Sequence, residues 1–465
     1  MGSGDQKFTL QVLWQSEDAI RVTPFKEGSV LESTIKTSRT CPFHSQLVAE
    51  RAQDILSILA RANAGEAGLL PELEAAGQAI YVDLLPAFLK EKLEEATATN
   101  LLLHLDRQLV GIPWELLHDG DAFLGRRFRI GRVVSMETTG GVAMQRSMRS
   151  PLSVLVVADP CGDLPAARTE AEEVAEVLEA SPAVRDVTTL MGRVTTRQLR
   201  DALGRHDVLH FAGHADARRG AAHLRLADGA FSAKLLDQLR GRIDFPGLVF
   251  LNGCGSADDT VKLSEGTDPL GAVSGIASSF LMSGVRHVVG TLWEVRDEVA
   301  RAFALAFYAA LGRGVAVGGA MAAGQDAIVE RWGEDSLLWP AHLLYGDPTW
   351  KVDPPDENTL DDFAVLDGLE SKSRAELASA DPATRLMAAA MLLRLGDHSV
   401  IPALGRDLDT LEAWLSTDAP QREQRLAAHV LQALAAAAGL QPSGPPDQLP
   451  DAEAVRALFA RLRES

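Results

Sequence analysis

Two stretches decide the fold of this chain: VLHFAGHA at residues 208–215 and LVFLNGCG at residues 248–255. Each is a short apolar run that ends at glycine, the pattern of a strand buried on both faces of a parallel sheet. The first run is followed by His214 and the second by Cys254, 40 positions later, which leaves room for one crossover helix. Because ligands bind beyond the carboxyl ends of such strands, we expect the imidazole and the thiol to meet there.

Strand and helix patterns alternate on either side of these two runs. This βαβ alternation predicts a layered α/β sheet with helices on both faces. The further strands are predicted at 152–160, 285–293 and 342–352, and the helices at 168–180, 195–203, 232–240 and 271–284.

Residues 1–150 have their own strands and helix and are predicted to extend the same sheet as a companion half, whereas 151–353 form the half that carries His214 and Cys254. A hairpin is expected at 8–25, a helix at 45–62, and strands at 100–106 and 127–135. The glycine-rich, basic segment 140–151 between the halves is expected to be exposed.

Strand signals vanish after Pro354-Pro355, and residues 358–465 predict a small all-α domain. Arg385 and Arg425 sit in two similar helical stretches 40 positions apart, a spacing in the range of HEAT-type repeats. The alternative is an irregular helical domain without true repeats.

The composition is typical of a globular protein: 46% hydrophobic and 23% charged, with a formal net charge of −19. This charge disfavours nucleic acid and anionic membranes as partners. Three cysteines are too few and too scattered for a disulfide framework or a zinc site, and no stretch has the length of a membrane span or the pattern of a signal peptide. We therefore expect a soluble cytoplasmic protein without a metal or cofactor.

A thiol and an imidazole together can perform nucleophilic catalysis. A free thiol has a pKa of about 8.5, so a neighbouring imidazole must take its proton for attack at neutral pH. The glycines around Cys254 allow a tight turn whose N–H groups could stabilise an oxyanion. Taken alone, Cys254 is better explained as a small buried hydrophobe, and His214 as a packed or surface histidine. His210 is interpreted as a packed, hydrogen-bonded residue rather than a metal ligand with His214. Cys161 is interpreted as a loop cysteine.

Six blocks, in order, resemble the CHAT family of caspase-like peptidases related to caspases and separase. They are VGIPWELL (110–117), LPAARTEAEEV (164–174), VLHFAGHA, LVFLNGCGSA, SSFLMSGVRHVVGTLWEVRDEVA (278–300) and LLYGDPTW (343–350). The resemblance implies a caspase-like fold, with Cys254 as nucleophile, His214 as general base, and the backbone N–H groups of Cys254 and Ala215 as the oxyanion hole. Ala215 stands where the family commonly has glycine, a change that keeps the backbone donor.

Substrate preference is predicted from the carboxylates that border the two catalytic segments. Asp216, Asp258 and Asp259 could pair with a substrate arginine, so cleavage after Arg or Lys is expected; the alternative is that they are solvated loop residues. The basic loops then offer possible activation cleavage sites, at Arg146, Arg149, Arg218 and Arg219.

The sequence therefore predicts a cysteine endopeptidase that acts on protein substrates. The family's setting suggests a regulated effector in bacterial defence or cell death, whose C-terminal helices bind an activating protease or regulator. Two alternatives stay open: a catalytically silent caspase-fold adaptor, and a cysteine hydrolase of small amides.

Overall fold

A computed structural model describes most of the 465-residue chain. The described residues are 6–26, 38–135, 146, 148, 150–218, 221–252, 269–291, 293, 295–352, 371–394, 400–415, and the single positions 419, 424, 427, 430, 431, 433 and 434. Contacts divide the chain into two compact units, Met1–Pro354 and Pro355–Ser465.

The first unit is built on one large sheet, which confirms the predicted α/β class. Its order among the described strands is β3-β2-β1-β4-β5-β14-β13-β12-β8-β6-β7, so strands from both predicted halves lie in the same sheet. The strands are β1 Lys7–Ser16, β2 Ala19–Lys26, β3 Arg39–Pro42, β4 Asn100–Asp106, β5 Arg129–Ser135, β6 Leu152–Ala158, β7 Val184–Met191, β8 Val208–Ala212, β12 Leu248–Asn252, β13 His287–Thr291 and β14 His342–Tyr345. A smaller sheet in the order β11-β10-β9 consists of β9 Ala215–Arg218, β10 Ala221–Leu226 and β11 Gly229–Ser232.

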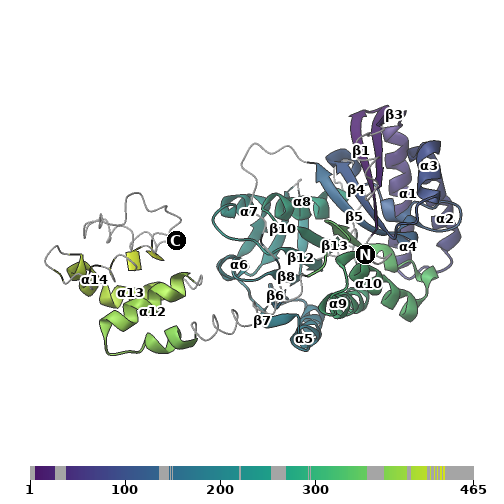
Figure 1. The fold of residues 1–465 in the computed structure, drawn as a ribbon. Coiled ribbons are helices and arrows are strands. Elements are labelled where there is room, and N and C mark those ends of the chain that lie inside the picture. The colour runs from purple at the N-terminus through teal and green to yellow at the C-terminus, as the bar shows by residue number, and fades with distance from the viewer. Residues whose placement is uncertain are drawn as a thin grey trace. The chain divides into compact units, whose positions relative to one another are not determined.

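Helices cover both faces of the large sheet, as predicted. Figure 1 shows α5, α9 and α10 on one side of the central strands, and α7 and α8 on the other. The helices of this unit are α1 Ser45–Asn63, α2 Leu70–Leu84, α3 Ala87–Glu94, α4 Leu124–Arg127, α5 Pro165–Glu179, α6 Thr196–Leu203, α7 Ala233–Leu239, α8 Pro269–Met282, α9 Asp297–Gly312 and α10 Val317–Trp332.

The central strands form because most of their side chains are apolar on both faces. Every residue of these four strands, β6, β8, β12 and β13, is buried. They pair in parallel, β6 with β8, β8 with β12, and β12 with β13. Parallel strands need a crossover between them, and α8 supplies it between β12 and β13. The carboxyl ends of all these strands therefore lie at one edge of the sheet.

Strand β14 brings another part of the chain to that same edge. It runs antiparallel to β13, so its first residue, His342, lies beside Thr291, the last residue of β13. It pairs in parallel with β5, so the amino-terminal ends of β14 and β5 face the same way as the carboxyl ends of β12 and β13.

The expectation that segment 140–151 is exposed is wrong at its described positions. Met148 is buried against Gly247, where a Cβ would overlap its side chain. Arg146 is half-buried, and its Nε lies 2.8 Å from Asp207 Oδ1 while Nη1 donates to the carbonyl oxygens of Gly204 and Asp244. The segment is anchored because its arginine neutralises a partly buried carboxylate.

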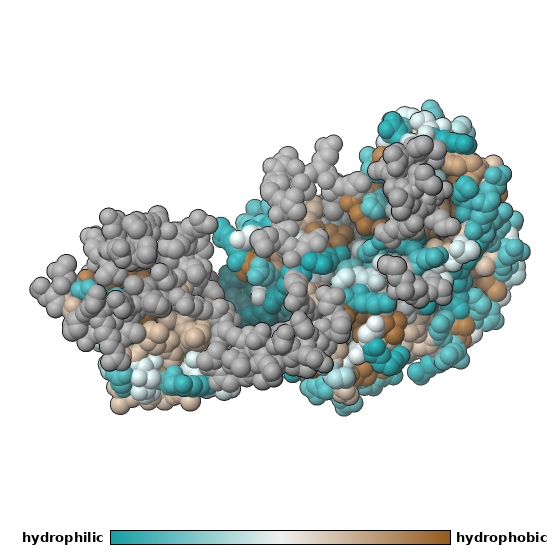
Figure 2. All heavy atoms as spheres, in the orientation of Figure 1, coloured by the Kyte–Doolittle hydropathy of each residue, from teal (hydrophilic) through white to brown (hydrophobic). Residues whose placement is uncertain are grey.

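On the face drawn in Figure 2, hydrophilic residues cover much of the described surface of the first unit, and hydrophobic residues show as separate spots. Among the residues that the structure describes, no helix combines the length and apolar character that a membrane crossing requires.

The second unit has its own small apolar core. Its described helices include α12 Pro382–Arg394, α13 Ile401–Leu404 and α14 Leu408–Trp414. Arg385 on α12 donates from Nε to Asp407 Oδ2 at 2.8 Å, which ties α12 to the turn before α14. Arg425 lies outside the described residues, so the HEAT-type repeat stays a prediction.

Candidate active site

The two strands that lead to His214 and Cys254 are neighbours in the sheet. Their register pairs Val208 with Leu248 and Ala212 with Asn252, an offset of 40 residues throughout. His214 and Cys254 have the same offset in the sequence, and each follows its strand by two residues. The Gly213 N–H donates to the Asn252 carbonyl at 3.2 Å, so the segments stay paired one residue beyond β8. Cys254 itself lies outside the described residues.

The His214 ring is held by a carboxylate that the sequence did not single out. Its Nε2 lies 3.1 Å from Oδ1 of Asp163, in the loop between β6 and α5. The His214 side chain is 15% exposed and that of Asp163 52% exposed. Because an ionised carboxylate only accepts hydrogen bonds, this contact places the proton on Nε2 and leaves the Nδ1 lone pair available as a base.

Asp159 holds the loop that carries Asp163 through its side-chain bonds to Leu164 and Arg168. Asp159 adopts φ 47°, unusual for a residue with a side chain, and is 1% exposed. Its Oδ1 accepts the Leu164 N–H at 2.8 Å, and its Oδ2 pairs with Arg168 Nε at 2.5 Å. Burial alone would raise the pKa of Asp159, but these hydrogen bonds and the guanidinium hold it below its usual value. The loop also packs on Gly213, where a Cβ would lie 2.8 Å from Pro160 Cδ.

Ala215 is placed so that its backbone N–H is not used by the small sheet. Ala215 lies opposite Leu224, and the flanking Arg225 N–H donates to the His214 carbonyl at 2.9 Å. In an antiparallel ladder this marks a non-hydrogen-bonded pair, whose N–H groups point away from the partner strand. The Ala215 N–H therefore points away from β10, as a donor to an oxyanion would need to.

The predicted specificity carboxylates fall mostly outside the described residues. Asp216 lies in β9 opposite His223, but its side chain is not described, and Asp258 and Asp259 belong to the undescribed segment after β12. Another carboxylate, Asp297, begins α9 directly after β13. Desolvation, then the nearby charges of Glu170 and Glu298, raise the pKa of Asp297. Arg296 is the N-cap of α9, and Asp297 is the first helical residue.

The CHAT domain family matches residues 74–347, more than half of the chain. The chain belongs to this family. Among solved structures, the Arg-specific cysteine proteinase gingipain R is similar at 14% identity, with a TM-score of 0.40, over 61% of this chain and 75% of that one. The Saccharomyces cerevisiae separase–securin complex is similar at 12% identity and a TM-score of 0.46, over 74% of this chain and 30% of that one. No curated protein matches the chain.

The remaining predicted residues of the CHAT region have the following places. Arg146 is anchored as described above, Arg149 and Arg219 lie outside the described residues, and Arg218 ends β9 with its side chain undescribed. His210 is fully buried in β8, 3.3 Å from the Tyr308 hydroxyl through Nδ1, which confirms the prediction of a packed, hydrogen-bonded histidine. Cys161 is a half-buried cysteine outside any disulfide, two residues before Asp163, which confirms a loop cysteine.

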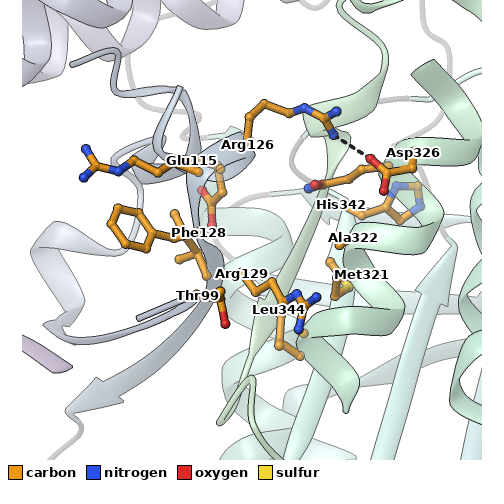
Figure 3. Close-up of a pocket in the computed structure, with 15 residues that line it drawn as sticks. Thr99, Glu115, Arg126, Phe128, Arg129, Met321, Ala322, Asp326, His342 and Leu344 are labelled. Carbon is orange, nitrogen blue, oxygen red and sulfur yellow. Dashed lines mark hydrogen bonds and ion pairs between the residues drawn. The ribbon is translucent and has the colours of Figure 1, made fainter. Parts of the chain in front are cut away.

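A cavity of about 270 Å³ lies farther along the same edge of the sheet, where β5 and β14 begin (Figure 3). Arg126, on its wall, donates to Asp326 at 3.0 Å across the opening. Its lining includes Thr99, Glu115, Arg129, Met321, Gln325 and His342. Neither His214 nor any other predicted catalytic residue that the structure describes lines this cavity.

Proposed function

We propose that this CHAT protein is a cysteine endopeptidase with Cys254 as nucleophile and His214 as general base. The observation that carries the proposal is the pairing of β8 with β12, whose offset equals the spacing of His214 and Cys254. The orientation of the His214 ring by Asp163 supports it independently, because a base needs one ring nitrogen fixed and the other open.

The proposed reaction begins with transfer of the Cys254 proton to Nδ1 of His214. The sulfur then attacks the carbonyl carbon of the scissile peptide, and the resulting oxyanion accepts hydrogen bonds from the N–H groups of Ala215 and Cys254. When the tetrahedral intermediate collapses, the C–N bond breaks and the imidazolium returns its proton to the leaving amine. Water, deprotonated by the same ring nitrogen, hydrolyses the thioester and releases the thiol.

We propose cleavage after Arg or Lys because carboxylates border the two catalytic segments in the sequence and one begins the helix after β13. Asp216, Asp258 and Asp259 follow the two catalytic residues in sequence, and Asp297 begins the helix after the neighbouring strand β13. A carboxylate that is partly removed from water, as that of Asp297 is, can bind a guanidinium through two parallel hydrogen bonds. Fluorogenic peptides that differ only in Arg, Lys or Asp before the scissile bond test this: faster turnover of the Asp peptide would exclude it.

The decisive experiment compares cysteine variants of the full chain. Cys254→Ala and His214→Ala must each abolish hydrolysis of a peptide that the wild type cleaves, while thermal unfolding stays unchanged. Cys161→Ala removes the thiol of the neighbouring loop and is the matched control, which should retain activity. Hydrolysis that survives Cys254→Ala would exclude the mechanism, and a folded wild type that cleaves neither proteins nor peptides would favour the adaptor.

Regulation by cleavage is part of the proposal. Arg149, Arg218 and Arg219 are the preferred sites, because Arg146 would first have to leave its bonds with Asp207 and two carbonyls. Replacing these three arginines by glutamine should block conversion to an active form, and unchanged activation would exclude the idea. We further propose that the C-terminal helical unit binds a regulator or partner protein, and that the enzyme serves as a bacterial defence effector.

A further inference from the structure

A group of buried polar side chains lies directly beneath the proposed active site, between the sheet and the helices α5 and α9. Its five members are at most 9% exposed. They are Glu170 of α5, His210 of β8, Asn252 of β12, Tyr308 of α9 and His342 of β14, and they are called the buried network below.

The centre of the buried network is a bond between Asn252 and Glu170. Asn252 Nδ2 donates to Glu170 Oε1 at 2.6 Å, and Asn252 Oδ1 lies 3.2 Å from His342 Nε2. Only the NH₂ group of an amide can donate to a carboxylate, so this contact fixes which way the Asn252 amide faces. Burial lowers the pKa of His342 to about 3, so its ring is neutral and donates from Nε2 to Oδ1.

The buried network also reaches the strand that carries the proposed base. His210 Nε2 lies 3.0 Å from Glu170 Oε1, although the contact does not meet hydrogen-bond geometry. On its other side, the Tyr308 hydroxyl lies within hydrogen-bond distance of His210 Nδ1, at 3.3 Å. Desolvation and then the charge of Glu170 raise the pKa of Tyr308 well above its usual range, so the hydroxyl keeps its proton.

The positions in the chain connect this network to catalysis. Asn252 is the last residue of β12 and precedes Cys254 by two, and His210 precedes His214 by four. Glu170 sits on the helix that begins just after Asp163. One carboxylate thus contacts both strands that lead to the proposed nucleophile and base.

A buried carboxylate among neutral partners is costly, and apolar side chains of similar size would pack at lower cost. What a hydrogen-bonded amide adds is direction, because its bonds allow one orientation of the side chain and therefore of the strand end that bears it. We propose that Glu170 and Asn252 are positioning residues for Cys254: their bond fixes the end of β12, which precedes Cys254 by two residues. This inference rests on the proposed function.

The test exchanges the acidic and amide groups between the two positions. Asn252→Asp places two carboxylates in contact and breaks the bond, and we expect kcat to fall about 100-fold while KM changes less than about threefold, the cost of a misplaced reacting group. Glu170→Gln keeps an oxygen that can accept from Asn252 and should lose less than about tenfold. In the double variant that combines Glu170→Gln with Asn252→Asp, the introduced glutamine amide can donate to the introduced carboxylate, and activity should return to within about tenfold of the wild type.

A purely structural role makes a different prediction. Asn100→Asp is the matched control, because Asn100 is another buried asparagine, at the start of β4, whose Nδ2 donates to the Gln6 carbonyl. It should lower the unfolding temperature without changing kcat. The inference is overturned if Asn252→Asp keeps the wild-type kcat, or if the double variant is no more active than Asn252→Asp. It is also overturned if, across all the variants including Asn100→Asp, the loss of kcat simply follows the loss of unfolding temperature.

Alkylation of Cys254 by iodoacetamide separates this inference from the proposed function. The rate of alkylation, measured as a function of pH, shows whether an imidazole activates the thiol. This measurement needs no peptide substrate. We expect Asn252→Asp to slow alkylation of Cys254 at neutral pH and the double variant to restore it, with Cys161 unchanged as the internal reference. If the wild type cleaves no peptide but shows this pattern, the peptidase proposal fails and the positioning role stands. An identical Cys254 rate in all variants overturns the positioning role.

Discussion

Replacing Asp163 by asparagine tests whether this carboxylate orients the proposed base. The substitution keeps the size of the side chain and removes its charge. In the wild type, Oδ1 of Asp163 lies 3.1 Å from Nε2 of His214. An asparagine can still accept a hydrogen bond through its oxygen, but it can also turn its NH₂ group toward the ring and favour the wrong tautomer.

The expected magnitude follows from the exposure of the pair. Buried carboxylates of catalytic triads are worth about 10⁴-fold in rate. Here Asp163 is 52% exposed, so water screens the interaction strongly. We therefore expect a cost of about 1–2 kcal/mol in the barrier, which corresponds to a fall in kcat of about 5- to 30-fold. KM should stay nearly constant, because the contact is with the base and not with the substrate.

The assay is steady-state hydrolysis of one peptide at low and high salt. The difference between wild type and Asp163→Asn should shrink at about 1 M salt, where exposed charges are screened within about 3 Å. Asp237→Asn, which removes another exposed carboxylate paired with Arg240 on α7, is the control and should leave kcat unchanged. An unchanged kcat would show that Asp163 does not orient the base, and a loss above about 10³-fold would show that the exposure argument is wrong.

Three further predictions concern the body that supports the site. Glu115→Gln should destabilise the fold by about 3–5 kcal/mol in urea unfolding, because it leaves the Arg132 guanidinium, which is 0% exposed, without its counter-charge. Gly131→Ala should lower the unfolding temperature, because its Cβ would overlap the Gly346 carbonyl oxygen; normal stability would contradict the close approach of β5 and the turn after β14. His342, with a folded pKa of about 3, stays neutral while the unfolded residue, with a pKa near 6.5, takes up a proton, so stability is lost as pH falls below about 6.5. The loss should reach about 2 kcal/mol at pH 5, and His342→Asn should show that much less acid sensitivity in urea unfolding at pH 7 and 5.

The central sheet could be predicted from the sequence because its strands are apolar on both faces. Runs such as LSVLVVA and LVFLN are apolar apart from one small polar residue each, with no alternation that would place one face at a surface, and the helical patterns between them require parallel crossovers. The same logic places His214 and Cys254 at strand ends. Strand β7 was not predicted, because it lies at the sheet edge, where none of its residues is buried and half-buried positions mix with exposed ones.

Asp163 could not be predicted from the sequence because the order of strands in the sheet is not their order in the chain. Strand β6 comes before β7 and β8 in the chain, yet it lies directly beside β8, with Ala158 opposite Ala212. Only that adjacency brings the β6–α5 loop to His214. The sequence shows only a polar turn, ADPCGD, after a buried strand. The conformation of that turn depends on the side-chain bonds of Asp159, which the sequence does not reveal. The small sheet after His214 was not predicted either, because its strands are short and rich in alanine.

The bond between Asn252 and Glu170 also bears on why β8 and β12 pair in one register. Side chains alternate along a strand, so a slip of one residue would turn the Asn252 amide to the opposite face of the sheet and leave the Glu170 carboxylate buried without its donor. An apolar strand end would resist such a slip only through packing, whereas here the slip exposes a charge to an apolar interior. The same slip would change the 40-residue offset of β8 and β12, which equals the spacing of His214 and the proposed nucleophile Cys254. A single buried amide can therefore select the register during folding, and the Asn252→Asp variant removes that selection.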